Sequence, residues 1–152
     1  MMHFVAYGRT AIIQANKFLG GEPPRNYIET PQIQRSPYGT PNRTGTAYEP
    51  PHLFQINAVV DTATRDILRK QRNRHMQAPG PWLIYDYTEP FSEASPRTRA
   101  LAPNASETID GDDVIYYAQF RAELQGTIRL SQLGMGWHQF EATFIETTKV
   151  PV

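Results

Sequence analysis

The sequence predicts a mainly β protein, an antiparallel β-sandwich or open barrel with one flanking helix and a long extended arm. Several segments alternate apolar and polar residues with the period of a half-buried strand. Only one segment has a helical pattern, so the strand–helix alternation of a parallel sheet is missing. Seven of the thirteen prolines fall between Gly20 and Pro51, a density that excludes long regular elements there.

The first half of the chain supplies two strand regions and the helix. Residues 3–19 are predicted to be extended, with a break near Gly8, and Gly20 and Gly21 end this region. Residues 53–60 alternate as a half-buried strand. Asp61 is then predicted to cap a helix over residues 62–76, whose narrow apolar stripe contains Ala63, Ile67, Leu68 and Met76.

The second half is predicted to consist of strands separated by one long loop. A strand over residues 82–88 precedes a loop over 90–112 that contains Pro96, Pro103 and an Asp-Gly turn signal. Residues 114–125 alternate most clearly and are predicted to form one strand of about 40 Å. Two further strands are expected over residues 127–133 and 137–147. The predicted number of strands in the whole chain is six to eight.

The chain is predicted to be a single domain over residues 1–152, with residues 20–52 as a proline-rich arm. A loop longer than about 15 residues is usually functional or disordered. Apolar side chains in this arm have reason to leave water, which distinguishes it from a plain linker. We therefore expect the arm to lie along another molecule. Its candidate contact residues are Tyr27, Ile28, Ile33, Tyr38 and Tyr48.

The composition excludes several classes of protein. The formal net charge is zero, whereas a dedicated nucleic-acid binder usually has a strong basic excess. The chain has no cysteine, which rules out disulfides and thiolate metal sites and favours synthesis in the cytosol. We also expect no signal peptide and no transmembrane helix, because no apolar stretch approaches 18 residues.

No catalytic, cofactor or metal motif is present in the sequence. The four histidines are scattered, without the local pairs that zinc sites use. No phosphate-binding glycine loop, dinucleotide fingerprint or serine-nucleophile elbow is found. The acidic cluster at residues 107–113 does not match the frame of a calcium loop, and its Asp-Gly is ordinary hairpin chemistry. We therefore expect no cofactor and no enzymatic activity.

Two charged patches are candidate contact surfaces. The basic patch consists of Arg65, Arg69 and Arg72 on the predicted helix. Two other interpretations of these arginines remain open, a solvated helix face and a contact with phosphate. The acidic patch consists of Asp110, Asp112 and Asp113. The alternative interpretation is that these residues only form a turn. A basic patch on one copy that meets an acidic patch on the next gives a heterologous contact, which can close into a ring.

Two rival functions remain open. Aromatic residues, with Tyr87 and Tyr117 as the best candidates, could form a platform for a carbohydrate or peptide. A hydrolase would use Asp86, Asp112 or Glu146 as acid or base, but it needs two carboxylates that converge in a cleft, and the sequence spacing gives no support for that.

The chain resembles the tail structural proteins of tailed bacteriophages, a group that includes tail-tube, distal-tail and baseplate-ring components. The resemblance lies in the strand–helix–strand region Leu53–Thr88, the closing strands Val114–Gln125 and Trp137–Thr147, and the arm. It implies a homo-oligomeric ring, often sixfold, in the virion, with contacts to adjacent tail or baseplate proteins. It implies no catalytic residue. From the composition we also expect no membrane partner and no specific nucleic-acid binding.

Overall fold

The computed structural model describes residues 1–20, 25–27, 32–35, 41–44 and 51–152. Its strands form three antiparallel sheets, and the largest has the order β2-β1-β7-β11-β12-β6-β3. The strands of this sheet are β1 (Met2–Ala6), β2 (Arg9–Ile13), β3 (Arg25–Tyr27), β6 (His52–Asp61), β7 (Trp82–Asp86), β11 (Gln119–Gly134) and β12 (Trp137–Lys149). The other two sheets contain β8 (Phe91–Ala94), β9 (Thr108–Asp110) and β10 (Asp113–Tyr116), and β4 (Gln32–Arg35) and β5 (Pro41–Thr44).

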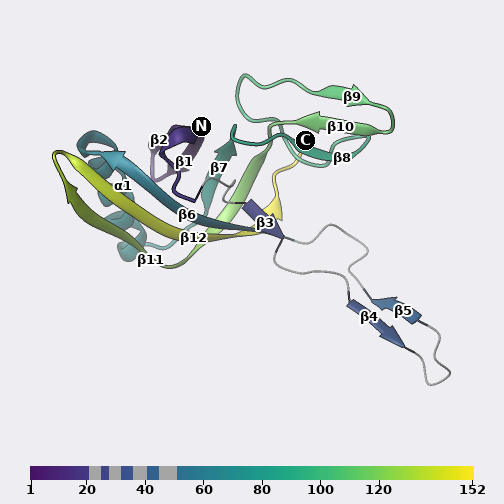
Figure 1. Ribbon diagram of the computed structural model, residues 1–152, viewed down its shortest axis with the longest axis horizontal. Coiled ribbons are helices and arrows are strands. Elements are labelled where there is room, and N and C mark those ends of the chain that lie inside the picture. Colours follow the sequence, from purple (N-terminus) through teal and green to yellow (C-terminus); the bar gives the residue numbers. More distant parts are fainter. Residues whose placement is uncertain (21–24, 28–31, 36–40, 45–50) are drawn as a thin grey trace.

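The seven-stranded sheet curls around its own core (Figure 1). Phe4 on β1 packs against Phe140 and Phe144 on β12, at ring-centroid distances of 5.8 and 5.7 Å, although β7 and β11 separate the two strands. Beyond β2, the amide of Leu19 donates to the carbonyl of Asn57 on β6 at 2.7 Å, after the short 3-10 helix Ala15–Lys17. The two sides of the sheet therefore approach one another, as the predicted mainly β, sandwich-like fold requires.

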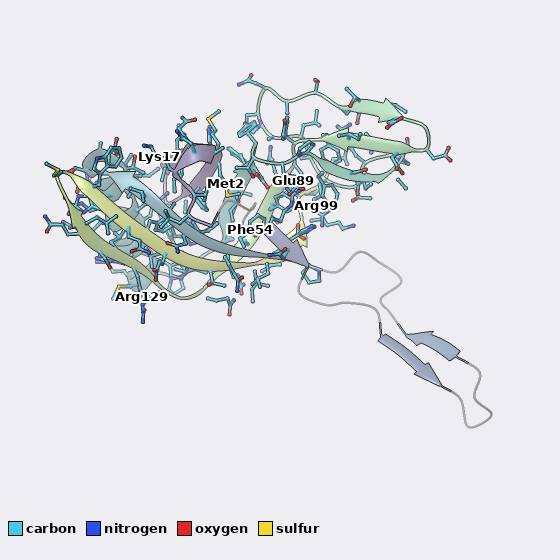
Figure 2. All side chains as sticks on the ribbon, in the orientation of Figure 1. Met2, Lys17, Phe54, Glu89, Arg99 and Arg129 are labelled. Carbon is cyan, nitrogen blue, oxygen red and sulfur yellow. The ribbon has the colours of Figure 1, made fainter. Side chains whose placement is uncertain are left out.

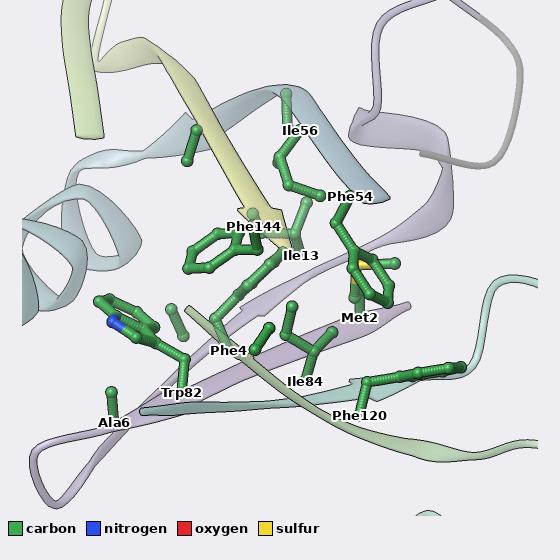
Figure 3. Close-up of a cluster of buried hydrophobic side chains, with 14 of the residues drawn as sticks. Met2, Phe4, Ala6, Ile13, Phe54, Ile56, Trp82, Ile84, Phe120 and Phe144 are labelled. Atoms are coloured by element: carbon green, nitrogen blue, oxygen red, sulfur yellow. The ribbon is translucent and has the colours of Figure 1, made fainter. Parts of the chain in front are cut away.

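The core consists of the apolar positions that alternate along these strands. Figure 3 shows Phe4, Phe54, Trp82, Phe120 and Phe144 converging from five different strands, and all five side chains are fully buried. Each aromatic side chain of this size removes 150–250 Å² from water, so this cluster dominates the hydrophobic stabilisation.

The predicted helix is confirmed as α1 (Thr62–Gln77), and Asp61 caps it by accepting a hydrogen bond from the amide of Thr64 at 2.8 Å. Leu68 is fully buried, but Ala63 and Met76 are exposed, so the apolar stripe is narrower than predicted. Gln71 is also fully buried, and its amide donates to backbone carbonyls of the β1–β2 hairpin, including that of Phe4 at 3.0 Å. This polar contact fixes the helix to the hairpin, because a buried amide without partners would be costly.

Three predictions about the second half of the chain are wrong. The predicted loop over 90–112 contains β8 and β9. The predicted strand over 114–125 is interrupted at Tyr117 and Ala118, so that β10 lies in the three-stranded sheet and β11 in the seven-stranded one. The segments 119–125 and 127–133 are one strand, whose pairing shifts register between Gln125 and Arg129 around Gly126. The described residues contain twelve strands rather than six to eight.

Candidate assembly surfaces

The arm is an insertion between two paired strands. β3 pairs antiparallel with β6, and Tyr27 lies directly opposite His52. Residues 25–27 and His52 therefore belong to the sheet rather than to the predicted arm of 20–52, and they delimit an arm of residues 28–51. Within it, β4 and β5 pair with one another and form their own sheet. Figure 1 shows this hairpin lying well away from the other two sheets.

The base of the arm is fixed by a buried ion pair. Arg25 on β3 donates from Nη1 to Oδ2 of Asp86 on β7 at 2.6 Å, and their side chains are 6% and 0% exposed. The guanidinium also lies 5.2 Å from the centre of the Phe120 ring. A buried carboxylate without a partner is strongly destabilising, so this contact holds β3 at the sheet edge.

A second buried ion pair lies where the arm returns to the sheet. Arg99 donates from Nε to Oε2 of Glu146 and from Nη2 to Oε1, both at 2.9 Å, in the bidentate geometry that makes such pairs strong. Nδ1 of His52 lies 3.3 Å from Oε1 of the same carboxylate. Figure 2 labels Arg99 near the base of the arm. Phe91 and Phe120 pack against this guanidinium at 4.8 and 5.4 Å.

Burial alone would raise the pKa of Glu146. Hydrogen bonds from His52 and Arg99, together with the positive charge of Arg99, outweigh burial and hold the pKa below its ordinary value. The carboxylate is therefore ionised at neutral pH. Glu146 and Asp86, two of the carboxylates that a hydrolase would use, each face a buried guanidinium, and this arrangement favours a structural role for both.

Of the three arginines in the basic patch, Arg65 forms an ion pair within the chain. Arg65 pairs with its neighbour Asp66 at 2.9 Å between Nε and Oδ1, whereas Arg69 is exposed and Arg72 is half-buried. The three arginines are spaced four and three residues apart, so they lie along one face of α1. Like charges at such spacings repel one another, and a partner of opposite charge would relieve the repulsion.

The acidic patch lies on the β9–β10 hairpin. Asp110, Asp112 and Asp113 are all exposed, and Asp110 lies directly opposite Asp113 in the strand pairing. Gly111 takes a φ of +63° in the turn between them, as the Asp-Gly signal predicts. Figure 1 shows this hairpin and α1 at opposite ends of the molecule. One copy therefore does not bring the two patches together.

The five candidate contact residues of the arm are mostly beyond what the structure describes. Ile28, Tyr38 and Tyr48 lie outside the described residues. Tyr27 and Ile33 are described only as backbone positions in β3 and β4. Their predicted role as contacts between subunits stays a prediction.

The two candidate platform residues lie in a small aromatic cluster: Tyr87 directly follows β7, and Tyr117 lies between β10 and β11. Tyr87 and Tyr117 are half-buried, with ring centres 6.1 Å apart. The cluster also contains His3, which the sequence gave no reason to select, at 5.2 Å from Tyr87. The hydroxyl of Tyr87 donates to the carbonyl of Pro103 at 2.7 Å, and burial raises the pKa of this tyrosine.

Among the described residues, no group of three or more His, Asp or Glu side chains is arranged to hold a metal ion. Within the same part of the chain, no helix is long and apolar enough to span a membrane. Comparison with protein-family models, with curated proteins and with solved structures found no match to this chain.

Proposed function

We propose that the protein is a structural subunit that self-assembles into a ring of the kind found in the tails and baseplates of tailed bacteriophages. The observation that carries the proposal is the arm at residues 28–51. It leaves and re-enters the sheet at one point beside two buried ion pairs, while its hairpin belongs to neither of the larger sheets.

The physical argument concerns the stability of the hairpin. Two paired strands of four residues each are marginally stable in water without further packing. The arm also contains Ile28, Ile33, Tyr38 and Tyr48, whose apolar surface favours burial. A neighbouring copy or an adjacent tail protein that covers the hairpin would supply both the packing and the burial.

The positions of the charged patches support a ring rather than a symmetric dimer. A basic surface at one end and an acidic surface at the other favour head-to-tail contacts, which close when the rotation between copies permits. The resemblance to tail proteins implies that the ring contains six copies and is part of the virion.

The experiment replaces residues 28–51 with Asn-Gly. Because Tyr27 and His52 are directly opposed, a two-residue type I′ turn can join them without disturbing β3 or β6. We expect the full chain to form assemblies of several copies at high protein concentration, and the Asn-Gly variant to remain a folded monomer. Light scattering after gel filtration measures the mass, and circular dichroism controls for folding. Equal masses for the two proteins would contradict the proposal.

The cluster of His3, Tyr87 and Tyr117 favours one second candidate, a binding module for carbohydrates or peptides. In that case the full chain is a monomer, and oligosaccharides or peptides perturb the NMR signals of these side chains. Substitution of Tyr117 by Ala would then abolish the perturbation, whereas removal of the arm would not.

A further inference from the structure

An open groove of about 680 Å³ lies between the C-terminal half of α1 and the middle of β11. Arg72, Asn73 and Met76 line it from the helix, and Arg129 and Leu130 line it from the strand. The strand bends here, because its pairing with β12 shifts register between Gln125 and Arg129 and Gly126 takes a φ of +72°. Figure 2 labels Arg129 on β11, at the end of the molecule that carries α1.

The groove combines positive charge with exposed apolar surface. Within the described part of the chain, neither Arg72 nor Arg129 has an acidic group within ion-pair distance. Glu141 lies opposite Arg129 in the β11–β12 pairing, but its carboxylate accepts a hydrogen bond from Gln139 at 2.8 Å. Met76 is 72% exposed at one side of the groove. An occupant that suits this groove is acidic, narrow and partly apolar.

The turn of the β9–β10 hairpin has these properties. Asp110 and Asp113 face each other across the two strands, an arrangement of like charges that destabilises a hairpin when nothing compensates for it. No ion pair to either carboxylate is found among the residues that the structure describes. Ile109, beside them on the edge strand, is 62% exposed. Nearby Glu107, by contrast, is paired with Arg97 at 2.6 Å.

We propose that the groove between α1 and β11 of one copy receives the acidic turn Asp110–Asp113 of a second copy. This inference rests on the proposed self-assembly and names a contact for it that does not involve the arm. Figure 1 shows α1, which lines the groove, and the β9–β10 hairpin on opposite sides of the molecule, so the contact is head-to-tail and leaves one groove and one turn available for the next copy.

The chain has no cysteine, which permits a direct test with single-cysteine variants of the full protein. Asn73→Cys places a thiol in the groove, and Asp112→Cys places one in the turn. The two variants are mixed and oxidised, and disulfide-linked dimers are separated by gel electrophoresis. The matched control is Ala63→Cys, an exposed, uncharged position on the opposite face of the same helix from Arg72 and about 15 Å along the helix axis from Asn73. We expect Asn73→Cys to cross-link with Asp112→Cys at least about tenfold faster than Ala63→Cys does.

Charge reversal tests which groups carry the contact. Arg72→Glu with Arg129→Glu, or Asp110→Lys with Asp113→Lys, is expected to slow cross-linking about tenfold, and the variant with all four reversals recovers the original rate. Equal rates for the Asn73 and Ala63 positions would overturn the inference. The inference would also be overturned if each pair of charge reversals slowed cross-linking but the variant with all four reversals did not recover the original rate. In that case the acidic turn is not the occupant of the groove.

The failure of this inference can be told apart from the failure of the proposed role of the arm. If replacement of residues 28–51 leaves the assembly mass unchanged but charge reversal abolishes assembly, the groove contact is supported and the proposed role of the arm is refuted. If the arm is required and the cysteine pair does not cross-link faster than the control, the groove contact alone is refuted.

Discussion

Glu146→Gln tests whether the buried ion pair at the base of the arm stabilises the fold. Arg99 is 0% exposed, and its Nε and Nη2 donate hydrogen bonds to Oε2 and Oε1 of Glu146, both at 2.9 Å. Glutamine preserves the volume of the side chain but removes the negative charge of Glu146 that faces the buried guanidinium. Loss of one partner from a buried pair costs about 3–5 kcal/mol, a large part of the ~5–15 kcal/mol that holds a typical domain together.

Urea unfolding monitored by circular dichroism measures this loss directly. For a chain of this length, the corresponding drop in Tm is about 6–20 °C. The control is the double variant Arg99→Met with Glu146→Leu, which removes both charges and is expected to recover at least about 2 kcal/mol of the loss, because apolar replacements of buried pairs are often neutral or better. A Glu146→Gln variant within about 1 kcal/mol of the wild type would refute the reasoning.

The same variant has a defined pH dependence. Because the folded-state pKa of Glu146 lies below its ordinary value of 4.5, the stabilisation by its charge is fully present above that pH. It is lost as the pH falls through the folded-state pKa, where the carboxylate becomes protonated. The difference in unfolding free energy between the wild type and Glu146→Gln is therefore expected to shrink below pH 4.5. A difference that stays constant down to pH 2 would show that the charge contributes nothing.

Three further predictions concern the elements around the candidate surfaces. Asp61→Ala removes the acceptor for the Thr64 amide and is expected to lower the free energy of unfolding by about 1 kcal/mol, whereas Asp61→Asn, checked by the same denaturation assay, retains the cap. Leu68→Ala opens a cavity where α1 packs on the sheet and is expected to cost about 2–5 kcal/mol; a cost below about 1 kcal/mol would mean that this contact is not part of the core. Arg25→Met leaves Asp86 buried without its guanidinium, so amide protons of β3 are expected to exchange more than about tenfold faster while those of β7 change little. Unchanged exchange in β3 would show that the ion pair does not anchor the arm.

Local patterns were sufficient to predict much of the fold. The alternation of Phe54, Ile56 and Ala58 placed β6 and its buried face correctly, and Asp61 marked the start of α1. The break between β10 and β11 could not be found in this way. The alternating phase continues through Tyr117 and Ala118, both of which pack against the protein, although the chain changes from one sheet to the other there. Which sheet a strand joins depends on contacts between distant segments, and periodicity does not report them.

The sequence contained a sign of the buried ion pairs in the alternation pattern of the strands. Asp86, Glu146 and His52 each extend the inward-facing phase of a strand by one step, beyond Ile84, Phe144 and Phe54 respectively. A polar side chain in that phase indicates a buried partner. The partner of Glu146 could not be predicted. Arg99 lies in a segment whose sequence predicts a solvated loop, whereas the structure buries this side chain completely.

The central claim is that the arm at residues 28–51 docks on another molecule, and intermolecular photo-cross-linking tests it most directly. A benzophenone amino acid replaces Tyr38 in the full chain, and ¹⁵N-labelled and unlabelled copies are mixed before irradiation. Mass spectrometry of the cross-linked peptides then distinguishes links within a copy from links between copies. We predict that a large share of the links join labelled to unlabelled peptides and that this share falls on dilution. Links confined to single copies at every concentration would contradict the claim.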